Sequence, residues 1–88
     1  YIDQGASKAL KSGKSLLPAG IIKISGDFKK GDNIVIVDNN NIHIARALSS
    51  FTSEEINKIK GLQSNQIENI LGYASKSEIV HKDDIVIL

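Results

Sequence analysis

Residues 15–48 constrain the fold of this chain more than any other stretch, because short apolar runs alternate there with strong turn signals. The only proline and three of the seven glycines fall within it. Asp38 and the three asparagines that follow it tolerate left-handed backbone, so they predict a hairpin turn. Gly20 marks either a bulge or a place where other backbone or a ligand comes close. Strands are predicted over residues 21–25, 33–37, 42–48 and 85–88.

Three short helices are expected around these strands. Asp3 can cap a helix that ends at Gly13, since the apolar residues between them recur at helical spacing. Thr52 and Glu55 have the spacing of a capping box, in which each side chain accepts a hydrogen bond from a free backbone N–H. Residues 64–72 predict a third helix, capped by its serine, closed by its glycine and burying its isoleucines and leucine on one face.

The runs 33–37 and 85–88 are almost wholly apolar. This pattern is typical of strands between two covered faces, so we expect the first to be covered on both faces and the second to lie in the sheet interior. Fifteen isoleucines, against two tyrosines and two phenylalanines, indicate an aliphatic, β-rich core. We therefore predict a mainly β fold with short helices, of the α+β class, forming a compact and partly closed barrel.

Eighty-eight residues, 41% of them apolar and 24% charged, are ordinary for one globular domain. The sequence has no cysteine, so disulfides and thiolate metal sites are excluded, which fits a reducing cytosol and predicts a cytoplasmic protein. No apolar run approaches the ~18–20 residues that cross a bilayer, and no signal peptide is evident, so no membrane partner is expected. Because Tyr1 is not a natural start, we expect a fragment of a longer protein.

Few residues offer chemistry. His43 is expected to lie half-exposed on a strand, and His81 to donate a hydrogen bond that stabilises a turn; neither belongs to a metal-ligand set. The adjacent carboxylates of Asp83 and Asp84 point to opposite sides of an extended segment, which makes a shared acid–base site improbable. We therefore predict no catalytic and no metal-binding residue in this chain. The net charge is only +1, and the pI of about 8.2 lies below the value of about 9 that is typical of nucleic-acid-binding domains.

A series of short motifs covers essentially the whole chain. In order, these motifs are Tyr1-Ile2-Asp3-Gln4-Gly5-Ala6 with Ala9-Leu10, Leu16-Leu17-Pro18-Ala19-Gly20-Ile21, Gly26-Asp27-Phe28, Gly31-Asp32, Ile44-Ala45-Arg46, Ser53-x-Glu55, Ser64-x-x-Ile67-x-x-x-Leu71-Gly72-Tyr73 and Ile79-Val80-His81-Lys82-Asp83-Asp84. In their order and spacing they resemble the C-terminal PUA domains of bacterial glutamate 5-kinases. The Pro-x-Gly and Gly-Asp elements alone would indicate only a PUA domain.

The resemblance implies a pseudo-barrel of mixed strands decorated by short helices, with residues 1–88 as a single PUA domain. It also implies a parent enzyme that phosphorylates the γ-carboxylate of glutamate, with ATP and Mg²⁺, in the first step of proline biosynthesis. That chemistry belongs to an upstream amino-acid-kinase domain, which would be the partner of this one in a homo-oligomeric parent. No catalytic residue and no cofactor are therefore expected in the fragment itself, whose role would be regulatory or structural.

PUA domains of RNA-modifying enzymes bind structured RNA through the first helix and the adjacent Pro-Gly strand. By position, the resemblance implies as candidate RNA-contacting residues Lys8, Lys11, Lys14, Gly20, Lys23 and Arg46. The alternative to an accessory kinase domain is thus an RNA-binding module of a tRNA- or rRNA-modifying enzyme. A free-standing enzyme is a third reading, which no constellation of residues favours.

Overall fold

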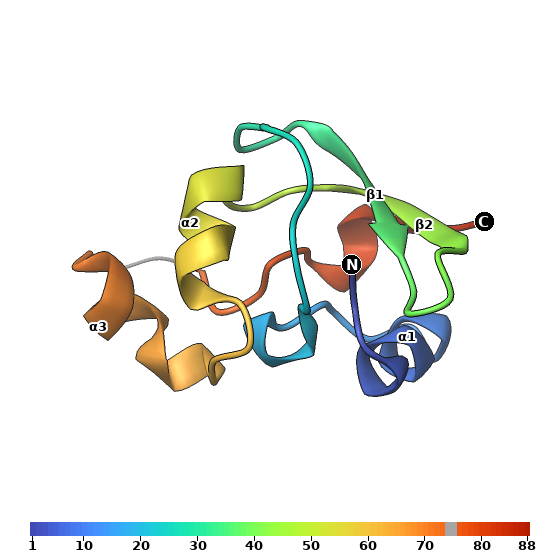
Figure 1. Cartoon of the computed structure of the whole chain (residues 1–88), viewed down its shortest axis with the longest axis horizontal. Coiled ribbons are helices and arrows are strands. Elements are labelled where there is room, and N and C mark those ends of the chain that lie inside the picture. Colours follow the sequence, from blue (N-terminus) through green and yellow to red (C-terminus); the bar gives the residue numbers. More distant parts are fainter. Residues whose placement is uncertain (74–75) are drawn as a thin grey trace.

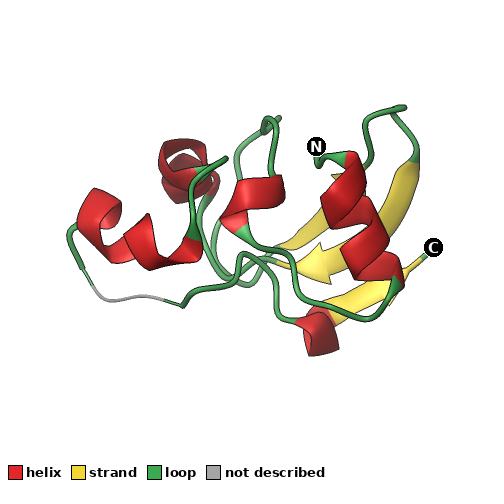
Figure 2. Cartoon of the chain, turned by 90° about the horizontal axis from the view of Figure 1, so that it is seen from below, coloured by secondary structure: helices red, strands yellow, loops and turns green. Residues whose placement is uncertain are grey.

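A computed structural model describes residues 1–73 and 76–88 of the protein. It measures 34 × 22 × 22 Å, with α2 and α3 at one end and the sheet and α1 at the other (Figure 1). Loops and single turns of helix connect the two ends (Figure 2). In chain order the elements are α1 (Gln4–Lys11), η1 (Pro18–Gly20), β1 (Asn33–Val37), β2 (His43–Leu48), α2 (Ser53–Ile59), η2 (Ser64–Gln66), α3 (Ile67–Leu71), η3 (Lys82–Asp84) and β3 (Ile85–Ile87), where η denotes a 3₁₀ turn.

The first helix forms as its sequence predicts. The Asp3 side chain accepts a hydrogen bond from the Ala6 N–H at 2.8 Å, and this bond satisfies one of the free donors at the helix start. Leu10 points into the core, and the chain leaves the helix through Gly13 at a φ of +83°. A side chain would be strained at that φ, so the glycine fits the turn that follows α1.

The sheet is antiparallel, with the strands in the order β1-β2-β3. The pairing of β1 with β2 shifts register between Ile36 and Val37, because Ile36 lies opposite Ala45 and Val37 opposite His43. This bulge adds Ile44 to β2, so that Ile44 and Ala45 are both buried although they are neighbours. It explains why the alternation of apolar and polar residues along this strand stops after Ile44.

The predicted strand over residues 21–25 is wrong. Residues 18–20 form a 3₁₀ turn, and the segment after it makes only one bridge, between Ile21 and Ile2. Hydrogen bonds from the Ile22 N–H to the Tyr1 C=O, 2.8 Å, and from the Asp3 N–H to the Gly20 C=O, 2.9 Å, flank that bridge. Because α1 begins at Gln4, only the few residues before it can pair with this segment, and no longer ladder forms.

Two expectations about strand burial are also wrong. Val35 of β1 is 39% exposed, so that strand is not covered on both faces. β3 forms an edge of the sheet rather than its interior, and its Val86 is 66% exposed. The apolar runs led to the error because one face of this small sheet packs on the core while the other is open.

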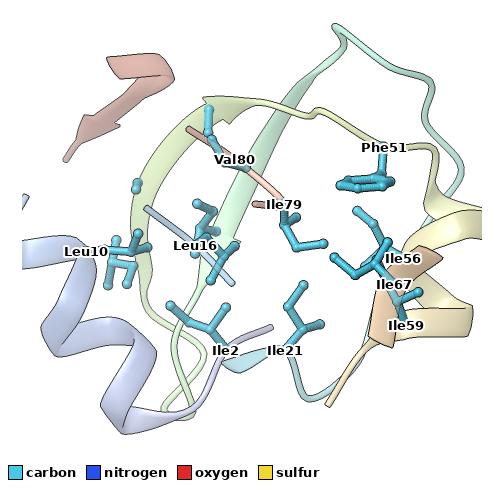
Figure 3. Packing of buried hydrophobic residues seen from close by; sticks show 14 residues of the cluster. Ile2, Leu10, Leu16, Ile21, Phe51, Ile56, Ile59, Ile67, Ile79 and Val80 are labelled. Atoms are coloured by element: carbon cyan, nitrogen blue, oxygen red, sulfur yellow. The ribbon is translucent and has the colours of Figure 1, made fainter. Parts of the chain in front are cut away.

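The core lies between the inner face of the sheet and the helices (Figure 3). Besides β1 and β2, the segments around Ile2, Leu16 and Val80 line it, and a bridge pairs Leu16 with Val80. A hydrogen bond from the Ile2 N–H to the Val37 C=O joins the N-terminal segment to β1. Strand-like segments thus curve around the core, and the α+β class predicted from the sequence is confirmed.

The third predicted helix differs in detail. Its first turn is 3₁₀, with Gln63 rather than Ser64 at the cap, and α-helix begins only at Ile67. Ile67 is buried, but Ile70 is 49% exposed, so the expected apolar face is narrower than its sequence indicates. Gly72 closes the helix at a φ of +82°, as predicted. Of the connector predicted after it, over residues 73–80, residues 74 and 75 lie outside the described part.

The α2 capping box is present as predicted: the Glu55 N–H donates to Thr52 Oγ1 at 3.1 Å, and the Thr52 N–H donates to Glu55 Oε1 at 2.9 Å. Replacing Thr52 with alanine removes one of these bonds and leaves a donor of the first turn free. We expect Thr52→Ala to lower the free energy of unfolding by about 1 kcal/mol. Urea unfolding followed by circular dichroism measures this, and Thr52→Ser, which keeps the hydroxyl, is the control that should lose much less.

Candidate binding surfaces

The lysines predicted for RNA binding begin on α1. Lys8 and Lys11 are exposed in the last turns of that helix, and Lys14 follows just beyond its end. Lys14 lines a cleft of about 640 Å³ between α1 and the η1 turn. The apolar part of its lining includes Ala9 and the half-exposed Leu17. We call it the α1 cleft; its lining residues are Ala6, Ala9, Gly13, Lys14, Ser15, Leu17, Ala19, Gly20, Glu78, His81 and Lys82.

Gly20 lies where α1 meets the η1 turn. A Cβ atom at this position would lie 2.5 Å from the Cβ of Ala6, closer than two carbon atoms can approach. The close approach that the sequence indicated is therefore present, and its neighbour is the protein's own first helix. The glycine lets α1 pack against η1 and so shapes the α1 cleft.

Lys23 lies in a different place. Its Nζ is 4.3 Å from the centre of the Tyr1 ring, in cation–π geometry. Both residues line a second groove, of about 360 Å³, between β1 and the loop that follows Ile21. We call it the β1 groove. The amino group of Tyr1 donates a hydrogen bond to the Lys23 C=O at 3.0 Å within it.

Arg46 belongs to neither hollow. It lies on the open face of the sheet, where the strand pairing places it between Val35 of β1 and Val86 of β3. The structure therefore brings Lys14 and Gly20 together at the α1 cleft, with Lys8 and Lys11 on the adjoining helix. It places Lys23 and Arg46 on two other surfaces.

Lys82 is a basic residue of the α1 cleft that the sequence reasoning missed. Contacts between neighbouring residues bring Lys82 to the same cleft as Lys14. Leu16 pairs with Val80, and the Lys82 N–H donates a hydrogen bond to Ser15 Oγ at 2.9 Å. The two segments are 67 residues apart in the chain. Only a prediction that the segments around Leu16 and Val80 pair could have revealed it.

The histidines contribute to local structure. His43 is exposed at the start of β2, while His81 caps the η3 turn. Its Nδ1 accepts a hydrogen bond from the Asp83 N–H at 3.1 Å, so His81 stabilises the turn as an acceptor and the donor role expected for it is wrong. Within residues 1–73 and 76–88, no group of three or more His, Asp or Glu side chains could hold a metal ion.

Glu55 and Tyr73 join α2 to the segment after α3, the Tyr73 hydroxyl donating to the Glu55 carboxylate. Burial by itself raises the pKa of Glu55, but hydrogen bonds from Thr52 and Tyr73, together with the charge of Lys30, outweigh it and hold the pKa below its ordinary value. The same hydrogen bond raises the pKa of Tyr73. The pair thus favours a charged carboxylate and a neutral phenol, which suits a structural contact.

In the isolated 88-residue chain, in which Tyr1 carries a free amino group, that group gives a pH dependence that can be tested. Burial, and then the nearby Lys23 charge, lower its pKa below the ordinary 8.0. The unfolded chain therefore binds this proton more tightly, so stability should rise with pH through the lowered pKa and level off above about pH 8. Acetylation of Tyr1 removes this titrating amine. It should therefore raise the melting temperature at pH values below the lowered pKa and abolish the rise of stability with pH. Thermal unfolding of both forms between pH 6 and 9 measures this, and parallel curves would contradict it.

Comparison with known proteins places the chain among PUA domains, whose family profile matches residues 1–71. The chain is 49% identical to a glutamate 5-kinase of Thermoanaerobacter sp. (strain X514) over 89 aligned positions, which cover 100% of this chain and 24% of the relative. It is 52% identical to one of Bartonella henselae, covering 98% of the chain and 23% of the relative. It is 62% identical to one of Pelagibacter ubique, covering 97% and 23%.

The chain thus spans about a quarter of the length of the curated relatives that it matches. Among the described residues, no helix is long and apolar enough to cross a membrane.

Proposed function

Because this chain belongs to the PUA domain family, we propose that it is the C-terminal PUA domain of a glutamate 5-kinase, with a non-catalytic role in regulation or assembly. The observation that carries the proposal is the identity of 42–62% to proteins named glutamate 5-kinase, over 97–100% of this chain. The parent protein would transfer a phosphoryl group from ATP to the γ-carboxylate of glutamate in the cytoplasm, on a separate amino-acid-kinase domain that binds ATP and Mg²⁺.

The surfaces described above support an accessory role. The polar side chains of the α1 cleft come from Lys14, Ser15, Glu78, His81 and Lys82, a mixed set that resembles a solvated surface. The most exposed of the large hydrophobic side chains, Val86 and Leu88, lie on the open face and at the edge of the sheet. The exposed apolar side chains of this face favour contact with another protein surface, for which the kinase domain of the same chain is the candidate.

The kinase assignment is tested on the full-length protein. We expect ADP release from ATP that depends on added glutamate and on Mg²⁺, and that falls as proline is titrated in. Aspartate, one methylene shorter, is the matched control substrate and should give much slower release. Absence of glutamate-dependent release from a folded full-length protein would contradict the assignment.

RNA binding is the second candidate function, and one observation favours it: Lys14 and Lys82 line the same cleft, beside α1 with Lys8 and Lys11. Lys23 lines the β1 groove and Arg46 lies on the open face of the sheet, so neither belongs to this surface. If RNA binds here, the double variant Lys14→Ala/Lys82→Ala should weaken tRNA binding at low salt about 10-fold or more. It should also flatten the dependence of affinity on salt.

The matched control is Lys29→Ala/Lys30→Ala, which removes two exposed lysines away from the α1 cleft. Equal losses in the two double variants would indicate nonspecific attraction to the net charge. No retention of tRNA by the wild-type protein even at low salt would exclude the RNA-binding role.

A further inference from the structure

The outer edge of β3 has backbone groups without hydrogen-bond partners. The Leu88 N–H donates to the Ile44 C=O at 3.0 Å, which directs the backbone groups of Leu88 toward β2. Because residues two apart in a strand direct these groups to the same side, those of Val86 also face β2, while those of Ile85 and Ile87 face outward. Within the described residues, no backbone hydrogen bond satisfies the outward groups of Ile85 and Ile87. The edge is therefore open to another strand.

The side chains at this edge are apolar. Residues 85–88 are all aliphatic, and the last three are half-exposed or more, at 66%, 45% and 64%. Ile87 points to the same face as the fully buried Ala45 opposite it in β2, so its 45% exposure comes from the open edge beside it. Residues 85–88 contain no charge, no proline and no bulge, which are the features that usually prevent an edge from pairing.

We propose that the β3 edge is an interface between two copies of this chain, in which β3 pairs with β3 of the second copy in antiparallel orientation. A two-fold axis perpendicular to the sheet passes between the two Val86 residues. Each Ile85 then lies opposite Ile87 of the second copy, as a hydrogen-bonded pair. This register satisfies both outward-facing residues of each strand, whereas an axis at Ile85 or at Ile87 leaves one of them without a partner in the other strand.

A second copy fits this edge because the edge is complementary to itself under the two-fold rotation. On the core-facing side, the half-exposed Ile87 is covered by Ile85 of the second copy. On the open face, the two Val86 side chains form a non-hydrogen-bonded pair, in which Cβ atoms lie about 4.5–5.5 Å apart. The row of Val35, Arg46 and Val86 continues into the same row of the second copy, so the two open faces become one surface.

The size of this interface sets the strength that we expect. One short strand from each copy buries much less than the roughly 1,200 Å² at the lower end of stable interfaces, so the 88-residue chain should associate weakly. Two copies that are held together by another part of a longer protein have an effective concentration of about the millimolar range. Pairing should therefore be stable in such an assembly.

Disulfide cross-linking tests the centre of the pair. The chain has no cysteine, so Val86→Cys introduces a single thiol beside the two-fold axis, where the Cβ separation is close to the 3.5–4.5 Å that a disulfide needs (about 3.8 Å on average). Val35→Cys is the matched control, because Val35 is also exposed on the open face but lies on β1. At about millimolar concentration, we expect Val86→Cys to form a linked dimer about tenfold or more faster than Val35→Cys.

Hydrogen exchange distinguishes strand pairing from linkage by chance collisions. In the linked dimer, the Ile85 and Ile87 amides should exchange about tenfold or more slowly than in the reduced chain. The Val86 amide, which faces β2 in both forms, is the internal reference. Ile87→Pro removes an outward N–H and no bond to β2, so adding it to Val86→Cys should abolish the faster linkage.

Equal rates of linkage for Val86→Cys and Val35→Cys would overturn the proposal, and so would a linked dimer in which the Ile85 and Ile87 amides still exchange fast. The full-length protein, with any other cysteines replaced by serine, gives an independent measurement, since its Val86→Cys variant should link two subunits even in dilute solution. Protected Ile85 and Ile87 amides without linkage there would show that a different strand occupies the edge, and no protection would show that it stays open; either result would overturn the proposal. None of these measurements depends on glutamate turnover, so the proposal and the kinase assignment can fail separately.

Discussion

Replacing Phe51 with alanine is expected to lower the free energy of unfolding by about 3–5 kcal/mol. The side chain is 1% exposed and packs in the core near Ile56 and Ile79 (Figure 3). Its removal loses the transfer of a large apolar group from water and leaves a cavity between the sheet and α2. Since small domains have a total stability of about 5–15 kcal/mol, the variant should be largely unfolded at modest urea concentrations.

The hydrogen bonds to the Phe51 backbone do not depend on the ring. The substitution therefore tests the packing of the ring separately from these hydrogen bonds. The Ser49 hydroxyl donates to the Phe51 C=O at 2.6 Å, and the Phe51 N–H donates back to Ser49 Oγ at 3.2 Å. Both can persist in Phe51→Ala. Val86→Ala is the control, because Val86 is 66% exposed and should change stability by less than about 0.5 kcal/mol. Similar urea midpoints for the two variants would contradict the core described here.

Gly20→Ala is expected to give the second large effect, a loss of about 1–3 kcal/mol. The added methyl group would lie 2.5 Å from the Ala6 Cβ, so α1 or the η1 turn must shift. Both are tied to the N-terminal segment, because Asp3 caps α1 and its N–H donates to the Gly20 C=O. Neither can move without disturbing those bonds. Urea unfolding monitored by circular dichroism measures the loss.

A double-mutant cycle shows whether the effect is steric. Ala6→Gly removes the atom that the new methyl group would meet, so it should recover part of the stability lost in Gly20→Ala, with a coupling of about 0.5–3 kcal/mol. Gly5→Ala is the matched control, because its nearest neighbour, Asp3 Oδ1, is 3.5 Å from the added Cβ. That change should be neutral or stabilising, since alanine favours helix over glycine. Additive effects at positions 6 and 20 would contradict a direct contact.

The local elements of this fold could be predicted where the signal lies in adjacent residues. The Asp3 cap, the Thr52–Glu55 capping box and the hairpin after β1 all depend on side chains that hydrogen-bond or turn within a few positions. The strand predictions were wrong where the structure depends on pairing with a distant segment. Residues 21–25 have the composition of a strand but face only a short partner, and no property of that segment alone reveals this.

For the candidate surfaces, too, local features could be predicted from the sequence and contacts between distant segments could not. The lysines of α1 could be placed on one helix by their spacing, but Lys82 joins them through pairing between distant segments. Lys23 and Arg46 were grouped with the lysines by resemblance, and the structure places them on the β1 groove and on the open sheet face. Composition could not separate these surfaces, because their positions depend on how the chain folds back on itself.

The central claim, an accessory domain outside the chemistry of a glutamate kinase, is tested most directly by deletion. Glutamate-dependent ADP release is measured on the full-length protein and on the same protein without residues 1–88. We predict turnover by both forms, with the deletion changing proline sensitivity or subunit assembly. Loss of turnover in a deleted protein that remains folded and still binds ATP would contradict the claim, because the domain would then supply part of the active site.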